Sequence, residues 1–244
     1  MNYIKMIQSL TPPFLQRSVR RVMGGCETTS SPIIVTDPSI GSFSQYHEDL
    51  IIDAILGCSQ EGFYIDVGAN HPQLLNNTKR FYDKGWRGVN IEPNPTLFNL
   101  LQQERINDIN LNVGLGKEKG EMYFYLLDPD SLSTFNLKTA ESAIESLGAR
   151  LVSRLLIDVN TLKDVLESYI SEQSIDFMSI DVEGYEEEVI AGGDWHKFRP
   201  KLLLMEINQR GKELIDSMQQ KDYRLIYSNG TNGIFIDDKA NVIK

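Results

Sequence analysis

Short apolar runs alternate with longer segments of helical periodicity from residue 43 onward, and this alternation is the feature that most restricts the fold. It is typical of parallel strands joined by helices that cover the sheet. The runs that have the composition of buried strands are Phe63–Val67 and residues 89–92, 109–113, 176–180 and 202–207. The sequence therefore predicts an α/β fold with a mostly parallel sheet.

Helical patterns fill most of the intervals between these runs. They cover residues 46–56, 74–84, 95–103, 141–149, 162–170 and 212–220. Residues 122–127 alternate like an additional strand, and residues 129–135, which are rich in Ser and Thr, predict a loop.

The last two apolar runs, residues 223–227 and 234–236, carry information on topology. Only the segment from Ser228 to Gly233 separates them. A parallel crossover needs about a dozen residues or more, so the two runs must pair antiparallel. The predicted sheet therefore ends in an antiparallel hairpin.

The charge balance restricts the partners of the chain. Lys and Arg number 24 against 34 Asp and Glu, which gives a formal net charge of −10 at pH 7. Phosphate backbones are bound by surplus Lys and Arg, so nucleic acid is not expected as a partner. Backbone N–H groups could still hold an anionic cofactor.

Cysteine usage and hydropathy point to a soluble cytoplasmic protein. Cys26 and Cys58 are the only cysteines, and neither belongs to a CxxC pair, so we expect neither a zinc site nor a disulfide scaffold. No apolar run approaches the roughly 20 residues of a membrane span. The first residues also lack the apolar core of a cleaved signal peptide.

Residues 1–42 differ in composition from the rest, and we place a domain boundary near Ser42. Pro and Gly residues interrupt this segment, while Arg17, Arg20 and Arg21 cluster among apolar residues at spacings that allow one short amphipathic helix. It is either a loosely attached arm or a segment that binds peripherally to a membrane surface. Residues 43–244 form the main domain.

The stretch from Asp66 to Asn70 places a carboxylate at the end of the first strand and a glycine where the chain turns. In open α/β sheets, ligands bind outside these strand ends. Gly68 has no Cβ, so a ligand can approach the backbone closely. The competing interpretation is a tight turn in which Asn70 caps a helix.

Glu92 ends the second strand, 92 − 66 = 26 residues after Asp66, where an acidic side chain can accept two ribose hydroxyls. A dinucleotide fold would favour Gly-x-Gly-x-x-Gly, but only Gly68 of these glycines is present. A nucleoside ligand without phosphate, such as S-adenosylmethionine, fits better.

Four segments, in order, resemble the FkbM family of S-adenosylmethionine-dependent methyltransferases. They are residues 44–49 (SQYHED), 63–70 (FYIDVGAN), 85–95 (GWRGVNIEPNP) and 179–186 (SIDVEGYE). The similarity covers about residues 42–208. It implies a class I methyltransferase fold, which is a Rossmann-like three-layer sandwich around a seven-stranded sheet whose last strand is antiparallel.

The resemblance also implies the cofactor-binding residues. Asp66, Gly68 and Asn70 would line the methionine and ribose parts, and Glu92 would hold the ribose hydroxyls with Asn94 close by. Asn112 and Leu115, after the third strand, would flank the adenine.

Acidic groups at later strand ends could assist the methyl acceptor, because a sugar hydroxyl is a poor nucleophile without a base or a metal. Asp181 is the favoured general base, with Glu183 beside it, and His71 is another candidate base. Alternatively, Asp181, Glu206 and Asn208 could hold a divalent cation. The remaining interpretation is that Glu183 and residues 186–188 are a capping and solvated charge run.

We therefore expect an O-methyltransferase that acts on a hydroxyl of a sugar or glycan intermediate, in polysaccharide modification. The acceptor follows from the resemblance, and a non-sugar metabolite is the alternative. A nucleotide-dependent oxidoreductase on a similar fold and a non-catalytic binding protein are the other readings. The basic arm would suit lipid-linked saccharides at the inner membrane surface. The oligomeric state stays open.

Overall fold

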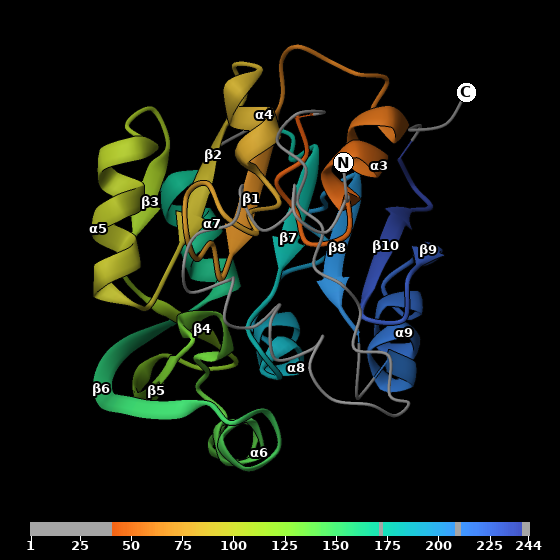
Figure 1. Cartoon of the computed structure of the whole chain (residues 1–244). Helices are drawn as coiled ribbons and strands as arrows, with labels where there is room; N and C mark the ends of the chain where they lie inside the picture. Colours follow the sequence, from red (N-terminus) through yellow and green to blue (C-terminus); the bar gives the residue numbers. More distant parts are fainter. Residues whose placement is uncertain (1–40, 171–172, 208–210, 241–244) are drawn as a thin grey trace, which may run out of the picture. The chain divides into compact units, whose positions relative to one another are not determined.

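The computed structural model describes residues 41–170, 173–207 and 211–240. Its central sheet has the strand order β3-β2-β1-β7-β8-β10-β9 (Figure 1). β10 pairs antiparallel with β8 and β9, and the other neighbours in this sheet pair parallel. The bounds are β1 Phe63–Val67, β2 Arg87–Ile91, β3 Ile109–Leu111, β7 Phe177–Ile180, β8 Leu202–Glu206, β9 Tyr223–Ser228 and β10 Asn232–Asp237. The predicted mostly parallel sheet with its antiparallel C-terminal hairpin is confirmed.

Side chains of the central strands alternate between two buried faces, as the pleat requires. Ile65 and Met178 belong to one hydrophobic cluster, whereas their neighbours Tyr64 and Phe177 belong to another. Residues of α7 (Leu162–Tyr169), α8 (Glu186–Ala191) and α9 (Gly211–Gln219) complete the first cluster, and residues of α3 (Glu48–Ile55) and α4 (Lys79–Asp83) complete the second. Helices therefore cover both faces of the sheet, as the three-layer prediction requires.

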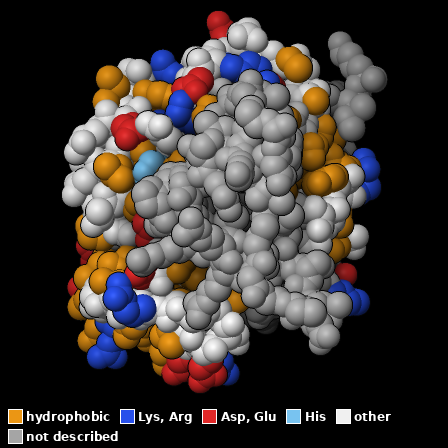
Figure 2. All heavy atoms as spheres, viewed as in Figure 1, with side chains coloured by type: hydrophobic (Ala, Val, Ile, Leu, Met, Phe, Trp, Pro, Cys, Tyr) orange, Lys and Arg blue, Asp and Glu red, His pale blue; other side chains and the backbone are white. Residues whose placement is uncertain are grey.

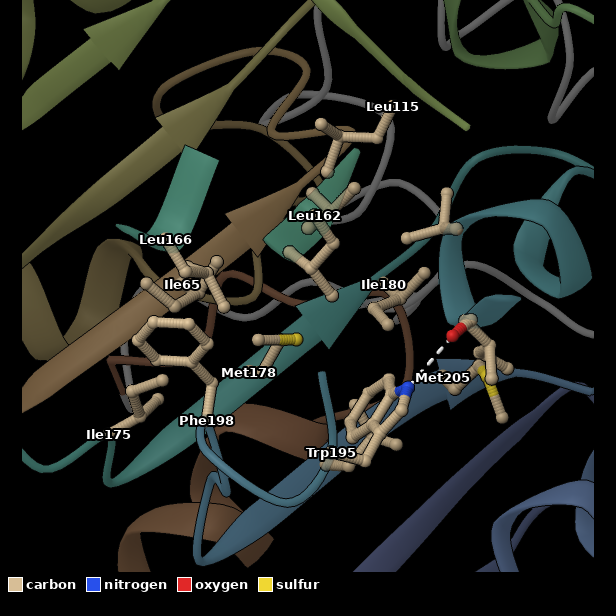
Figure 3. Close-up of a cluster of buried hydrophobic side chains, with 14 of the residues drawn as sticks. Ile65, Leu115, Leu162, Leu166, Ile175, Met178, Ile180, Trp195, Phe198 and Met205 are labelled. Atoms are coloured by element: carbon tan, nitrogen blue, oxygen red, sulfur yellow. Dashed lines mark hydrogen bonds between the residues drawn. The ribbon is translucent and has the colours of Figure 1, made fainter. Parts of the chain in front are cut away.

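The larger cluster holds three neighbouring strands against α7. Figure 3 shows Ile65, Met178 and Met205 of β1, β7 and β8 beside Leu162 and Leu166. The relative exposure of each of these five side chains is 1% or less. Burial of each side chain of this size contributes about 1.5–3 kcal/mol, so this contact stabilises the sheet.

The predicted helices over residues 46–56, 95–103, 141–149, 162–170 and 212–220 correspond to α3, α5 (Pro95–Glu104), α6 (Leu137–Leu147), α7 and α9. The prediction over residues 74–84 is wrong in its first half, because only Lys79–Asp83 is helical. Leu75 has a φ of 52°, which an α-helix cannot contain, and the Asn76 side chain accepts the Lys79 N–H at 2.7 Å. The helix therefore begins later than its apolar pattern.

The structure also contains a second, three-stranded sheet with the order β4-β6-β5, which the sequence analysis did not predict as a sheet. Its strands are β4 Gly114–Gly116, β5 Gly120–Asp128 and β6 Arg150–Thr161, and a short 3₁₀ turn, η2 Asp130–Leu132, lies in the predicted loop. The expected extra strand over residues 122–127 is part of β5. β6 is missed because three consecutive apolar residues, 155–157, interrupt the alternation that marks a strand. The parallel strands of the central sheet point towards this second sheet (Figure 1).

The second sheet and α6 present an apolar outer surface. The large hydrophobic side chains exposed there are Tyr123, Leu137, Ile144, Leu147, Leu151, Val152 and Leu156. Figure 2 shows hydrophobic and basic side chains together at the lower left of the view, over β5 and β6. The inner face of this sheet has its own small core of Phe124, Phe135 and Val159.

Nothing in the described ranges combines the length and apolar character that a membrane-crossing helix needs. The arm over residues 1–42 lies outside the described residues except for its last two. Its amphipathic helix and its membrane contact therefore stay predictions.

Removing the indole of Trp86 should destabilise the fold. Trp86 is 1% exposed, its ring contacts Phe81 and Phe177, and its Nε1–H donates to Ser59 O at 3.1 Å. We expect Trp86→Ala to lower the free energy of unfolding by about 3–5 kcal/mol, measured by urea denaturation. The control Ile106→Ala, at a side chain that is 71% exposed, should change it by less than about 0.5 kcal/mol. Equal effects would show that Trp86 is not part of the core.

Candidate active site

The loops that follow β1, β2 and β7 meet at one edge of the sheet, because these strands are neighbours. Gly68 N–H donates to Ile91 O at 3.0 Å, and Asp181 N–H donates to Val67 O at 3.0 Å. Backbone hydrogen bonds to β2 on one side and to the loop after β7 on the other thus fix the end of β1. Side chains that follow the three strands lie at this junction.

Gly68 is required by the backbone itself. Its φ is 77°, and a Cβ at this position would overlap the carbonyl oxygen of Asp181. The sequence interpretation was that the missing Cβ admits a ligand. That ligand contact stays a prediction, and the structure shows that the loop after β7 also approaches Gly68 closely, so the glycine allows the loops after β1 and β7 to meet.

Glu92 is a buried carboxylate held by two backbone N–H groups. Its Oε2 accepts from Asn70 N at 2.8 Å, and its Oε1 accepts from Asn94 N at 2.7 Å. Burial raises the pKa of Glu92 to about 7, against the effect of these two hydrogen bonds. Each carboxylate oxygen has a further acceptor position, so two ligand hydroxyls could still be bound there.

Asp66 is the second buried carboxylate at this edge. It is 3% exposed, and its Oδ2 accepts the Thr78 hydroxyl at 2.8 Å. Burial raises its pKa to about 6. The charges of Asp66 and Glu92 also interact, since Asp66 contributes to the raised pKa of Glu92. The predicted pair of acids therefore lies in one site.

Hydrogen bonds of Asn76 and Arg105 hold the loop between β1 and α4 from its interior, and the sequence interpretation did not assign Arg105 to the site. Asn76 Nδ2 donates to Ala69 O at 2.9 Å, and the fully buried Arg105 donates to Asn76 Oδ1 at 2.8 Å and Pro72 O at 2.9 Å. Arg105 also donates to the Tyr64 hydroxyl at 3.1 Å. No local pattern marks an arginine after a helix as buried, so this role emerges only in three dimensions.

The other residues predicted to bind the cofactor occupy different environments. Asn94 caps α5 by accepting from Thr96 N at 3.0 Å. Asn112 Nδ2 donates to Glu92 O at 2.8 Å, which brings it beside the end of β2. Leu115 lies in β4, is 4% exposed and packs in the larger hydrophobic cluster (Figure 3). Core packing alone explains Leu115, and its contact with adenine stays a prediction.

Asp181 and Glu183 lie in a group of interacting acids. Burial, followed by the charges of Glu186, Asp66 and Glu48, raises the pKa of Asp181 to about 7. Burial and the Asp181 charge raise the pKa of Glu183, whose backbone is left-handed with a φ of 53°. A carboxyl group with a pKa near 7, such as that of Asp181, can both accept and release a proton at physiological pH.

Two members of this acidic group have structural partners. Glu186 Oε1 accepts from Val182 N at 3.2 Å and Gly184 N at 3.1 Å, so it caps the loop before α8, as one interpretation of the charge run proposed. Glu48 is fully buried and accepts from the Asn232 amide at 2.6 Å. Sequence reasoning did not select Glu48, although it lies in the family-like segment at residues 44–49.

His71 has a different setting from these acids. Its Nδ1 accepts from Gln73 N at 3.1 Å and Leu74 N at 3.2 Å, and burial lowers its pKa. A neutral imidazole that accepts at Nδ1 carries its hydrogen on Nε2. In this arrangement His71 offers a hydrogen-bond donor, so its predicted role as a base gains no support.

The divalent-cation alternative gains no support either. Within the described ranges, no three His, Cys, Asp or Glu side chains are arranged to hold a metal ion. Asn208, one of the three suggested ligands, lies outside the described residues.

Substitution of Gly68 should disturb the junction of the two loops. Gly57 provides a matched control because its φ of 70° is similar, but a Cβ there meets no atom within 4 Å. Gly57→Ala should destabilise the fold by about 1–2 kcal/mol through its left-handed backbone. Gly68→Ala should cost about 1–3 kcal/mol more through overlap with Asp181. Chemical denaturation measures both, and equal losses would contradict the close contact.

Comparison with known proteins relates this chain to a methyltransferase family. A family model described as the methyltransferase FkbM domain matches residues 66–225. The methyltransferase FkbM from Methylobacillus flagellatus KT has 16% identity and a TM-score of 0.47, covering 72% of this chain and 44% of that protein. This chain thus aligns with less than half of that protein.

Two further solved structures are similar at lower scores. The TehB-like SAM-dependent methyltransferase from Corynebacterium glutamicum ATCC 13032 Kitasato has 11% identity and a TM-score of 0.41, covering 92% of this chain and 96% of that one. The precorrin-6y C5,15-methyltransferase from Geobacter metallireducens GS-15 has 10% identity and a TM-score of 0.39, covering 84% and 97%. The search of curated proteins gave no match. Because the family model spans well over half of the sequence, including the junction of β1, β2 and β7, this chain belongs to the FkbM methyltransferase family.

Proposed function

We propose that the chain is an S-adenosylmethionine-dependent O-methyltransferase that acts on a hydroxyl of a sugar or glycan intermediate. One observation carries the proposal. Two buried carboxylates, Asp66 and Glu92, lie at the ends of adjacent parallel strands, and the left-handed turn from Gly68 to Asn70 lies between them. Family membership supports methyl transfer, and the acceptor class rests on the family resemblance.

The hydrogen-bonding groups of this site fit an adenosyl ligand better than a dinucleotide. Glu92 is anchored by Asn70 and Asn94, which leaves carboxylate acceptor positions for a ribose diol. A diphosphate would need free backbone N–H groups. Those of His71 and Leu74 already donate to side chains in the same loop, and that of Asn70 donates to Glu92 after β2. This observation argues against the nucleotide-dependent oxidoreductase.

The protein would orient the two reactants and manage one proton. S-adenosylmethionine supplies an activated methyl group when bound. Asp66, Asn70, Glu92 and Asn94 would hold its nucleoside, with Asn112 adjacent. The Asp181 carboxylate would accept the hydroxyl proton of the acceptor, because a pKa of about 7 lets one group be ionised before the reaction and protonated after it.

Cofactor affinity should depend on the ionisation of Glu92. Hydroxyl donors require the ionised carboxylate, and burial raises the pKa of Glu92 to about 7, so affinity should fall as the pH drops below 7. We expect the Kd for S-adenosylhomocysteine to rise about tenfold between pH 8 and pH 6, measured by calorimetry.

The Glu92→Gln variant should bind about 10–100-fold more weakly at pH 8 and lose most of this pH dependence. The exposed control Glu121→Gln should behave like the wild type. No heat with S-adenosylhomocysteine, or an unchanged pH profile in Glu92→Gln, would contradict the assignment.

Substitution of Asp181 should lower turnover and leave cofactor binding unchanged. We expect Asp181→Asn to lower kcat for methyl transfer at least about 100-fold, since a general base contributes about 10²–10⁴. The Kd for S-adenosylhomocysteine should stay within about twofold. Radiolabelled methyl transfer to a panel of saccharides and other hydroxylated metabolites, with exposed Glu118→Gln as control, measures this effect and tests the acceptor class. Near-normal turnover in Asp181→Asn would exclude this role.

A further inference from the structure

A cleft of about 280 Å³ lies between α6 and the ends of β7 and β8. This volume is slightly below the range of about 300–1,000 Å³ that is usual for small-molecule sites, so it suits one ring-sized group. Glu183 and Glu206, which follow or end these strands, contribute one wall, and Thr139 and Ser142 of α6 contribute the opposite wall.

The lining of the cleft combines polar and apolar groups. Asn136, Thr139 and Ser142 offer an amide and two hydroxyls, while Ala143 and Leu214 offer apolar surface. A saccharide ring has the complementary pattern, with hydroxyls at its rim and C–H groups on its faces. Such a lining fits a polyhydroxylated ring better than a wholly apolar ligand.

The cleft is connected to the proposed reaction centre through Glu183. This side chain lines the cleft and follows Asp181 by two residues, and the Asp181 carbonyl packs against Gly68 on the cofactor side. A group in the cleft would therefore lie next to the proposed base.

Hydrogen bonds fix the two walls relative to each other. The Thr134 hydroxyl donates to Glu183 O at 2.9 Å, and Asn136 Nδ2 donates to Gly184 O at 3.1 Å. A Cβ on Gly184 would approach Thr139 Oγ1 to 2.7 Å, so α6 sits tightly on this loop. The second sheet and α6 thereby complete a site that begins on the central sheet.

The charge of the lining restricts the ligand. Glu183 and Glu186 are acidic residues that line the cleft, and Lys138 is the one basic residue among the described lining residues. A phosphate or carboxylate on the ligand would either be repelled by these acids or force further protonation. Both effects weaken binding.

We propose that this cleft is the acceptor subsite, and that it selects an uncharged hydroxyl-bearing ring over a phosphorylated or carboxylated one. The inference rests on the proposed methyl transfer for the reaction, and adds where the acceptor lies and which charge it carries.

Two tryptophan variants on α6 test the location. Ser142 lines the cleft, whereas Ser146 is one turn further along the same helix and does not; both are exposed. Saturation-transfer NMR would measure the Kd values of methyl glucoside, galactoside, mannoside and rhamnoside, with and without S-adenosylhomocysteine. We expect at least about tenfold weaker binding to Ser142→Trp, and wild-type binding to Ser146→Trp.

The same measurement on glucose, galactose and mannose 6-phosphates and on the uronates tests the charge preference. These probes should bind at least about tenfold more weakly than the neutral glycosides, and Glu183→Gln should reduce that ratio at least about threefold. Equal binding to both tryptophan variants, no binding of neutral glycosides to the wild type, or preference for anionic probes would overturn the inference. Lack of S-adenosylhomocysteine binding alone would instead contradict the proposed function, because saccharide binding is also measured without it.

Discussion

The buried carboxylate of Glu92 joins the loops after β1 and β2, and the candidate site depends on this interaction. One oxygen accepts from Asn70 and the other from Asn94, so a side chain at the end of one strand fixes the backbone beyond its neighbour. Burial raises the pKa of Glu92 to about 7, which shows that the fold places a group that prefers water in an interior position. Such a placement is typical of binding sites, where a ligand supplies the hydrogen bonds that water would otherwise supply.

A second constraint links this cofactor side to the acidic side of the site. The carbonyl of Asp181 packs against the Cα of Gly68, so the loop after β7 and the turn after β1 are in direct contact. Thr134 and Asn136 then attach the second sheet and α6 to Glu183 and Gly184. The site is therefore a chain of backbone contacts between loops, each of which is positioned by a rigid strand or helix. The second sheet is thereby attached to the candidate site on the central sheet.

Much of the central sheet could be predicted from the sequence. Its strands are short apolar runs between clear helical patterns, and the short link between the last two runs permits only a hairpin. The late start of α4 could not be predicted, because the left-handed Leu75 and the Asn76 cap replace a turn that the apolar pattern favours. β6 could not be predicted either, since its apolar residues 155–157 are consecutive, whereas the pattern that marks a strand alternates.

By itself the sequence determined the mostly parallel sheet with its antiparallel hairpin, the acids at the ends of β1 and β2, and the family, because each of these follows from local patterns and from their order along the chain. Only the tertiary structure decided that Gly68 makes room for a carbonyl, that Arg105 and Glu48 are buried next to the site, and that His71 accepts at Nδ1. The physical reason is that burial, hydrogen-bond direction and charge–charge coupling depend on residues far apart in the chain, such as Glu48 and Asn232, whose proximity no local pattern records.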